Sequence, residues 1–146
     1  VLKPPCPPQA VIEMLRYYDI EMTGKKVAVL GRSSVIGKPV ALLLLNENAT
    51  VTICHSKTAD LRETVREADI VISAMGRAKM IDGSYIREGA TLIDVGINTD
   101  EDGKLCGDAD FESAEKVAGA ISPVPGGVGS VTTTILAKNL LSGISE

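Results

Sequence analysis

One stretch near the start of the chain constrains the fold more than any other. An apolar run, Val27 to Leu30, stops at Gly31, and Gly37 then opens a long apolar segment. This order predicts a strand, a tight turn and a helix, because glycine tolerates the backbone angles of such a turn. The first turn of the helix offers free backbone N–H groups and the positive end of the helix dipole, which together bind phosphate. Pro39 fits that first turn, where its missing N–H costs nothing.

The turn differs from the G-x-G-x-x-G fingerprint of dinucleotide-binding domains. Only two glycines are present, Gly31 and Gly37, and they stand one position further apart than the outer pair of the fingerprint. Two interpretations therefore stay open at this point. The turn is either a phosphate site for a nucleotide or an ordinary strand-to-helix loop that ends in a glycine.

Apolar, β-branched runs alternate with segments of helical spacing along the rest of the chain. We expect strands at 27–30, 49–54, 69–74, 90–95 and 119–122, and helices at 9–18, 37–46, 58–68, 82–87, 111–117 and 130–142. We also expect no regular structure from Val1 to Pro8, an N-cap at Thr58, and a surface hairpin or loop over 99–107. The alternation predicts an α/β fold class, a Rossmann-like doubly wound, mostly parallel sheet with helices on both faces, in a single domain over 1–146.

The composition limits which partners the protein can have and in which cellular compartment we expect it. The formal net charge is −4 with no basic block, which argues against a nucleic-acid partner. No apolar run is long enough to predict a membrane span. Cys6, Cys54 and Cys106 are odd in number and widely spaced, so we expect free thiols, no metal site and a reducing, cytoplasmic location. The chain begins at Val1 without a Met, and we expect it to be a fragment of a longer protein.

Polar residues follow the predicted strands at their carboxyl ends, where an open parallel sheet binds its ligand. His55, Ser56 and Lys57 follow the second strand, where an NAD-binding domain places a carboxylate, and Arg32 and Ser33 follow the first. Cationic groups and hydroxyls suit a 2′-phosphate, which a carboxylate would repel, so these residues favour NADP over NAD. The alternative is that Arg32 and Lys57 are solvated surface charges and that His55 caps a turn or fills space between its neighbours.

Groups for catalysis are scarce. The chain has no Ser-His-Asp order with elbow spacing and no H-E-x-x-H, so we expect no catalytic residue within it. We interpret Asp94, at the end of a predicted strand, as a structural carboxylate that accepts N–H groups from a loop rather than as a general base. The run from Pro123 to Gly129 mixes prolines and glycines. It indicates either a shaped loop with close backbone approach to a ligand or a tight turn into the last helix.

Several short motifs follow one another in order across nearly the whole chain: Pro5-Cys6-x-Pro8, Gly31-Arg-Ser-x-Val-Ile-Gly37-x-Pro39, Ala49-Thr-Val-Thr-x-Cys54-His-Ser-x-Thr58, Ala68-Asp-Ile, Asp94-Val-Gly-Ile-Asn98, Gly107-Asp108 and Pro123-Val-Pro-Gly-Gly-Val-Gly129. Each motif is weak by itself, but the set is highly specific. As a set they resemble the C-terminal, nucleotide-binding domain of the bifunctional methylenetetrahydrofolate dehydrogenase/cyclohydrolase family.

The resemblance implies roles for particular residues. The cofactor-binding set it implies is Gly31, Arg32, Ser33, Ile36, His55, Ser56, Ala74, Gly76, Ile97 and Thr132. Within that set, Arg32, Ser33 and Ser56 would lie near the 2′-phosphate of NADP, and Ile97 and Thr132 near the nicotinamide. The loop residues Pro125, Gly126, Gly127 and Gly129 would face the folate cleft.

The resemblance also implies an activity. The whole protein, a homodimer, would oxidise 5,10-methylenetetrahydrofolate with NADP and hydrolyse the methenyl product to 10-formyltetrahydrofolate. The family's folate site and its Tyr-x-x-x-Lys pair lie in an N-terminal domain, so we expect this chain to be the cofactor half, inactive alone. Pro7, Ala10, Ser130 and Val131 depart from the family's usual Thr, Gly, Pro and Met, which bears on the shape beside the nicotinamide.

Two other interpretations remain. The first is a stand-alone NADP-binding regulatory module without chemistry of its own, which a full reading frame with an upstream folate domain would exclude. The second is the cofactor domain of another dehydrogenase, such as the shikimate type, which the Pro-Val-Pro-Gly-Gly loop disfavours.

Overall fold

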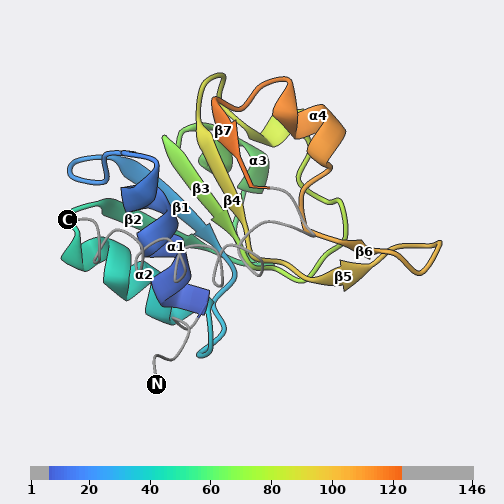
Figure 1. Cartoon of the computed structure of the whole chain (residues 1–146), viewed down its shortest axis with the longest axis horizontal. Coiled ribbons are helices and arrows are strands. Elements are labelled where there is room, and N and C mark those ends of the chain that lie inside the picture. The colour runs from blue at the N-terminus through green and yellow to red at the C-terminus, as the bar shows by residue number, and fades with distance from the viewer. Residues whose placement is uncertain (1–6, 123–146) are drawn as a thin grey trace, which may run out of the picture.

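The computed structural model describes residues 7–122 of the chain (Figure 1). Within these residues a five-stranded parallel sheet has the spatial order β2-β1-β3-β4-β7. Its strands are β1 (Lys26–Leu30), β2 (Thr50–Cys54), β3 (Ile70–Ser73), β4 (Thr91–Asp94) and β7 (Ala120–Ile121). A small antiparallel hairpin, β5 (Asn98–Thr99) with β6 (Leu105–Cys106), extends away from the sheet, as expected for 99–107.

Helices cover both faces of the sheet, which confirms the predicted fold class. On one face lie α1 (Pro7–Tyr17) and α2 (Gly37–Asn46); on the other lie α3 (Leu61–Arg66), the 3₁₀ turn η1 (Gly83–Tyr85) and α4 (Phe111–Glu115). Successive strand residues alternate between the two cores, because side chains of a strand point to opposite faces. Val27 and Val29 pack with α1 and α2, whereas Ala28 and Leu30 pack with α3 and α4.

The first helix begins earlier than we expected. We expected no regular structure through Pro8, but α1 begins at Pro7. Proline is tolerated in the first helical turn, because that N–H would have no partner inside the helix. Ala10, Val11, Met14 and Leu15 then form the buried stripe of α1 at helical spacing.

The expected N-cap at Thr58 is wrong. The hydroxyl Oγ1 of Thr58 accepts a hydrogen bond from the backbone N–H of His55 at 2.8 Å, so it closes the turn after β2. The cap position of α3 is Asp60, in the left-handed region with φ 48°, and the helix is shorter than the predicted 58–68. Threonine competes in this way because its hydroxyl reaches nearby backbone groups. The expected helix 82–87 is only the turn η1.

The order of the strands fixes where a ligand can bind. The chain passes from β1 to β2 on one side and then returns to β3 on the other side of β1. In open α/β sheets the crevice at such a reversal, outside the carboxyl ends of the strands, is the ligand site. The residues that follow β1, β2, β3 and β4 therefore form the candidate ligand-binding edge of the sheet.

Candidate functional site

The loop between β1 and α2 is built on two glycines that no other residue could replace without movement. Gly31 has a φ of 113°, in the region that favours glycine, and a Cβ on it would collide with the carbonyl oxygen of Ala74 at the end of β3. A Cβ on Gly37 would collide in turn with the carbonyl oxygen of Gly31. Three backbone segments thus meet at the switch point with no side chain between them. We call this close-packed turn, Gly31 to Gly37, the phosphate cradle, because it brings the N-terminus of α2, where a phosphate could bind, to the switch point.

Ser33 gives this loop its shape. Its hydroxyl oxygen accepts hydrogen bonds from the N–H groups of Ile36 at 3.1 Å and Gly37 at 3.3 Å, and its carbonyl accepts one from Lys38 at 2.9 Å. Within residues 7–122, no hydrogen bond is donated by the backbone N–H groups of Ser34 and Val35. They are open at the positive end of α2, an arrangement that suits an anion.

The end of β2 carries the residues expected at a 2′-phosphate. Leu30 and Cys54 are paired at the ends of β1 and β2, so the loops that follow them leave the sheet side by side. Arg32 and Ser56 are exposed, and neither has an ion pair or side-chain hydrogen bond within the part of the chain that the structure describes. The Nδ1 atom of His55 accepts a hydrogen bond from the N–H of Lys57 at 3.1 Å, which fits the alternative that His55 caps the turn.

The ends of β3 and β4 present small and apolar groups at the same edge. Ala74 is half-buried, and Gly76 is exposed with a φ of 72°. Ile97, which follows β4, is 72% exposed. An apolar side chain so open to solvent is available for contact with a flat ring. Of the remaining residues expected at the site, Ile36 is half-buried at the start of α2, whereas Pro125, Gly126, Gly127, Gly129 and Thr132 lie outside the described residues.

Asp94 accepts hydrogen bonds from the N–H groups of Gly96 at 2.9 Å, Asp108 at 3.1 Å and Ala109 at 2.8 Å. The carboxyl is 2% exposed, and this burial raises its pKa, against the backbone hydrogen bonds that lower it. The arrangement agrees with the structural role that we expected for Asp94. Sequence reasoning gave no role to Asp108, a buried carboxylate beside it, because the Gly107-Asp108 pair alone indicates no partner.

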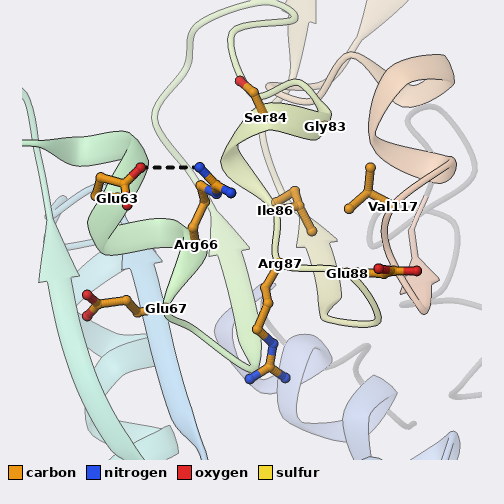
Figure 2. Close-up of a pocket in the computed structure, with 9 residues that line it drawn as sticks. All are labelled: Glu63, Arg66, Glu67, Gly83, Ser84, Ile86, Arg87, Glu88 and Val117. Atoms are coloured by element: carbon orange, nitrogen blue, oxygen red, sulfur yellow. Dashed lines mark hydrogen bonds and ion pairs between the residues drawn. The ribbon is translucent and has the colours of Figure 1, made fainter.

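A hollow of about 530 Å³ lies elsewhere, between α3, η1 and the segment before β7. Its lining residues come from the end of α3 and from segments that lead into strands, so it opens at the amino edge of the sheet (Figure 2). Both arginines that line it are already paired: Arg66 with Glu63 at 3.2 Å, an ion pair drawn in Figure 2, and Arg87 with Asp69 at 2.8 Å. It is therefore a poor phosphate site.

Two negative findings hold for residues 7–122. No helix there is long and apolar enough to cross a membrane. The same residues contain no group of three or more His, Cys, Asp or Glu side chains that could hold a metal ion.

A glycine-built phosphate cradle at the switch point of a parallel sheet defines a dinucleotide-binding domain of the Rossmann-like class. The comparison with protein families agrees and is more specific. The model for the NAD(P)-binding domain of tetrahydrofolate dehydrogenase/cyclohydrolase matches residues 5–146, and the chain belongs to this family.

Relatives and solved structures agree with the family. The chain is 58% identical over 138 residues to a bifunctional protein FolD of Clostridioides difficile, covering 94% of this chain and 48% of that protein. A crystal structure of FolD from Campylobacter jejuni superimposes with a TM-score of 0.86 at 44% identity, over 92% of this chain and 48% of that one. The structure of the Trypanosoma brucei FolD, in complex with NADP cofactor and an inhibitor, superimposes with a TM-score of 0.82 at 48% identity, over 94% of this chain and 49% of that one. The chain spans about half the length of the relatives it matches.

Proposed function

We propose that this chain binds NADP and presents its nicotinamide to a folate substrate held outside the residues described here. In the whole protein, a hydride would pass from the methylene carbon of 5,10-methylenetetrahydrofolate to the nicotinamide. Hydrolysis of the methenyl product to 10-formyltetrahydrofolate would follow. The observation that carries this proposal is the cradle at Gly31 and Gly37, with open N–H groups beside it.

The preference for NADP over NAD rests on the unpaired polar groups after β1 and β2. Arg32 and Ser56 are exposed and free of partners within residues 7–122, and no carboxylate directly follows β2. A guanidinium and hydroxyls bind a 2′-phosphate, whereas NAD-binding domains use a carboxylate for the ribose hydroxyls. The solved Trypanosoma brucei relative, which contains NADP, supports this preference.

The rest of the cofactor would follow the edge of the sheet. Ala74 and Gly76 would line the groove beneath the nucleotide, and Ile97 would contact the nicotinamide end. No catalytic residue is proposed within this chain, so its contribution is to bind and orient the cofactor. We propose that residues 1–146 form one NAD(P)-binding domain and that the folate site and the catalytic pair belong to another domain of the protein.

We propose that the protein assembles as a homodimer in the cytoplasm. β2 stands at one end of the sheet, and within the described residues its outer backbone edge pairs with no other strand. Such an edge suits pairing with a second copy. Cys54 and Cys106 are buried free thiols, which agrees with a reducing compartment. Sedimentation velocity of the purified chain would show a monomer if the dimer proposal is wrong.

Calorimetric titration of the chain with NADP and with NAD tests the main proposal. We expect NADP to bind at least about tenfold more tightly, which corresponds to about 1.4 kcal/mol. We expect no turnover with methylenetetrahydrofolate, since the second wall of the cleft is needed to hold the carbon within about 3–3.5 Å of the nicotinamide. Equal affinity for both cofactors would contradict the proposed 2′-phosphate role of Arg32 and Ser56. Ordinary turnover by this chain would contradict the proposal that the catalytic residues belong to another domain. Binding without any folate-dependent turnover in the full-length protein would favour the regulatory module.

A further inference from the structure

Asp108 is a buried carboxylate with an unusually full set of hydrogen-bond donors. Its side chain is 0% exposed and reaches across from the segment after β6 to the loop after β3. Five donors converge on its two oxygens: Ser73 Oγ at 2.9 Å, Met75 N at 2.7 Å, Gly76 N at 3.4 Å, Arg77 N at 3.0 Å and Asn98 Nδ2 at 3.0 Å. Three of them are consecutive backbone N–H groups, so one side chain fixes the direction of that loop.

The position of Asp108 is set by a reciprocal arrangement with Asp94. A Cβ on Gly96 would overlap the carboxylate of Asp108, and a Cβ on Gly107 would overlap the carboxylate of Asp94. Asp94 in turn accepts the backbone N–H of Asp108 at 3.1 Å. Each carboxylate thus occupies the space that the neighbouring glycine leaves empty, and neither can rotate freely.

The loop held by Asp108 is in direct contact with the phosphate cradle. The N–H of Ala74 donates to the carbonyl of Leu30 at 2.8 Å, and the carbonyl oxygen of Ala74 lies so near Gly31 that a Cβ there would collide with it. Because this contact is backbone against backbone, a shift of residues 75–77 is transmitted to Gly31 rather than absorbed by a flexible side chain.

We propose that Asp108 is a positioning residue of the nucleotide site: it fixes residues 75–77, and through Ala74 the phosphate cradle at Gly31, without touching the cofactor. This inference rests on the proposed function. All five partners donate, so the side chain must accept at both oxygens. An asparagine at this position would have nearly the same volume as the aspartate, but it would turn an N–H₂ group toward at least two of these donors.

The decisive variant is Asp108→Asn, with Val65→Ala as the matched control. Val65 is also 0% exposed, but it lies on α3, and its apolar side chain accepts no hydrogen bond from residues 75–77. We expect Asp108→Asn to weaken NADP binding at least about tenfold, or 1.4 kcal/mol, when measured by calorimetry at a temperature where both variants are folded. Val65→Ala lowers the melting temperature but leaves the affinity for NADP unchanged.

Amide hydrogen exchange supplies a readout that general destabilisation does not move. We expect faster exchange in Asp108→Asn at Met75, Gly76 and Arg77 in particular, whereas Val65→Ala accelerates exchange across the sheet. If Asp108→Asn does not fold, Ser73→Ala removes one of the five donors. It should raise exchange at residues 75 and 76 and weaken NADP a few-fold.

The outcomes separate this inference from the proposed function. No NADP binding by the wild-type chain overturns the proposed function and, with it, this role for Asp108. Normal NADP binding by the wild type, with Asp108→Asn and Val65→Ala equally affected at equal stability, overturns the positioning role alone. Faster exchange at 75–77 with unchanged affinity for NADP does the same, as does a Ser73→Ala variant that is unchanged in both measurements.

Discussion

The two halves of the carboxyl edge of the sheet use polar groups in opposite ways. After β1 and β2, the exposed side chains of Arg32 and Ser56 have no partner within the described residues, and two backbone N–H groups of the intervening loop are open. On the side of β3 and β4, Asp94, the last residue of β4, and Asp108, which follows β6, are at most 2% exposed. They accept eight hydrogen bonds between them, three for Asp94 and five for Asp108.

The difference separates two tasks. Groups that are to bind a ligand must exchange water for that ligand, so they remain exposed and unpaired before it arrives. Groups that hold loops in place must be saturated, because an unpaired buried polar atom costs about 1–3 kcal/mol. Substitutions in the first half should therefore change binding with little effect on folding, and substitutions in the second half should change folding first.

The largest effect should come from Gly96→Ala. The new Cβ would displace the carboxylate of Asp108 from its five donors, so we expect a loss of at least about 3 kcal/mol in the free energy of unfolding. The control is Gly103→Ala in the nearby hairpin, where φ is 79° and nothing in the described structure lies within 4 Å of the new atom. It should cost only about 1–2 kcal/mol, the penalty of a left-handed backbone. Urea denaturation measures both, and equal losses would show that the carboxylates do not fill these spaces.

Arg32→Ala tests the opposite half. We expect NADP binding to weaken by about 1.5–3 kcal/mol, the range for a hydrogen bond to a charged group, with NAD binding and the free energy of unfolding nearly unchanged. Arg66→Ala removes a similarly exposed arginine at the amino edge, and it should leave both cofactors unaffected. Calorimetric titration of both variants decides the matter. A parallel loss for NADP and NAD would remove Arg32 from the 2′-phosphate.

Ser33 belongs to both categories, since its exposed hydroxyl also holds the start of α2. Ser33→Ala should lower the free energy of unfolding by about 1 kcal/mol, as expected when a hydroxyl that accepts two backbone N–H groups is lost, and should also weaken NADP binding. Ser56→Ala removes a hydroxyl without hydrogen bonds in the described structure, and it should affect NADP alone. Denaturation and titration of the two variants separate the roles; an unchanged stability in Ser33→Ala would assign Ser33 wholly to the ligand.

The sequence predicts the first half of the edge much better than the second. The strand β1, the helix α2 and the residues around Gly31 depend on local spacing, and α2 has the bounds that its pattern predicts. Asp108 escapes such reasoning because its partners lie far along the chain, with Ser73 35 positions away. The N-cap expected at Thr58 is wrong for a local reason. The Thr58 hydroxyl could accept a hydrogen bond either from an N–H in the first turn of a helix or from an N–H in the turn after β2, and the structure has the second, from His55.

The smallest effect is a difference in pH dependence between an accessible carboxylate and a buried one. A backbone hydrogen bond from Lys26, together with Arg87, holds the pKa of Asp69 below its usual value of 3.8. Asp69 therefore stabilises the fold above about pH 4, and this contribution, less than about 1 kcal/mol for a surface pair, is lost as the pH falls through the folded pKa. Burial raises the pKa of Asp94, so its ionisation opposes folding at neutral pH, and that opposition is relieved as the pH falls toward 3.8.

Urea denaturation between about pH 3 and pH 7 distinguishes the two carboxylates. The stability difference between wild type and Asp69→Asn should shrink on acidification, because the ion pair with Arg87 and the bond from Lys26 lose their charged acceptor. The difference between wild type and Asp94→Asn should change in the other direction, since the protonated wild-type carboxyl no longer pays the desolvation of its charge. If both differences shrank together, the charge of Asp94 would stabilise the fold in the same way as the charge of Asp69. The contrast between exposed and saturated polar groups would then not extend to their ionisation.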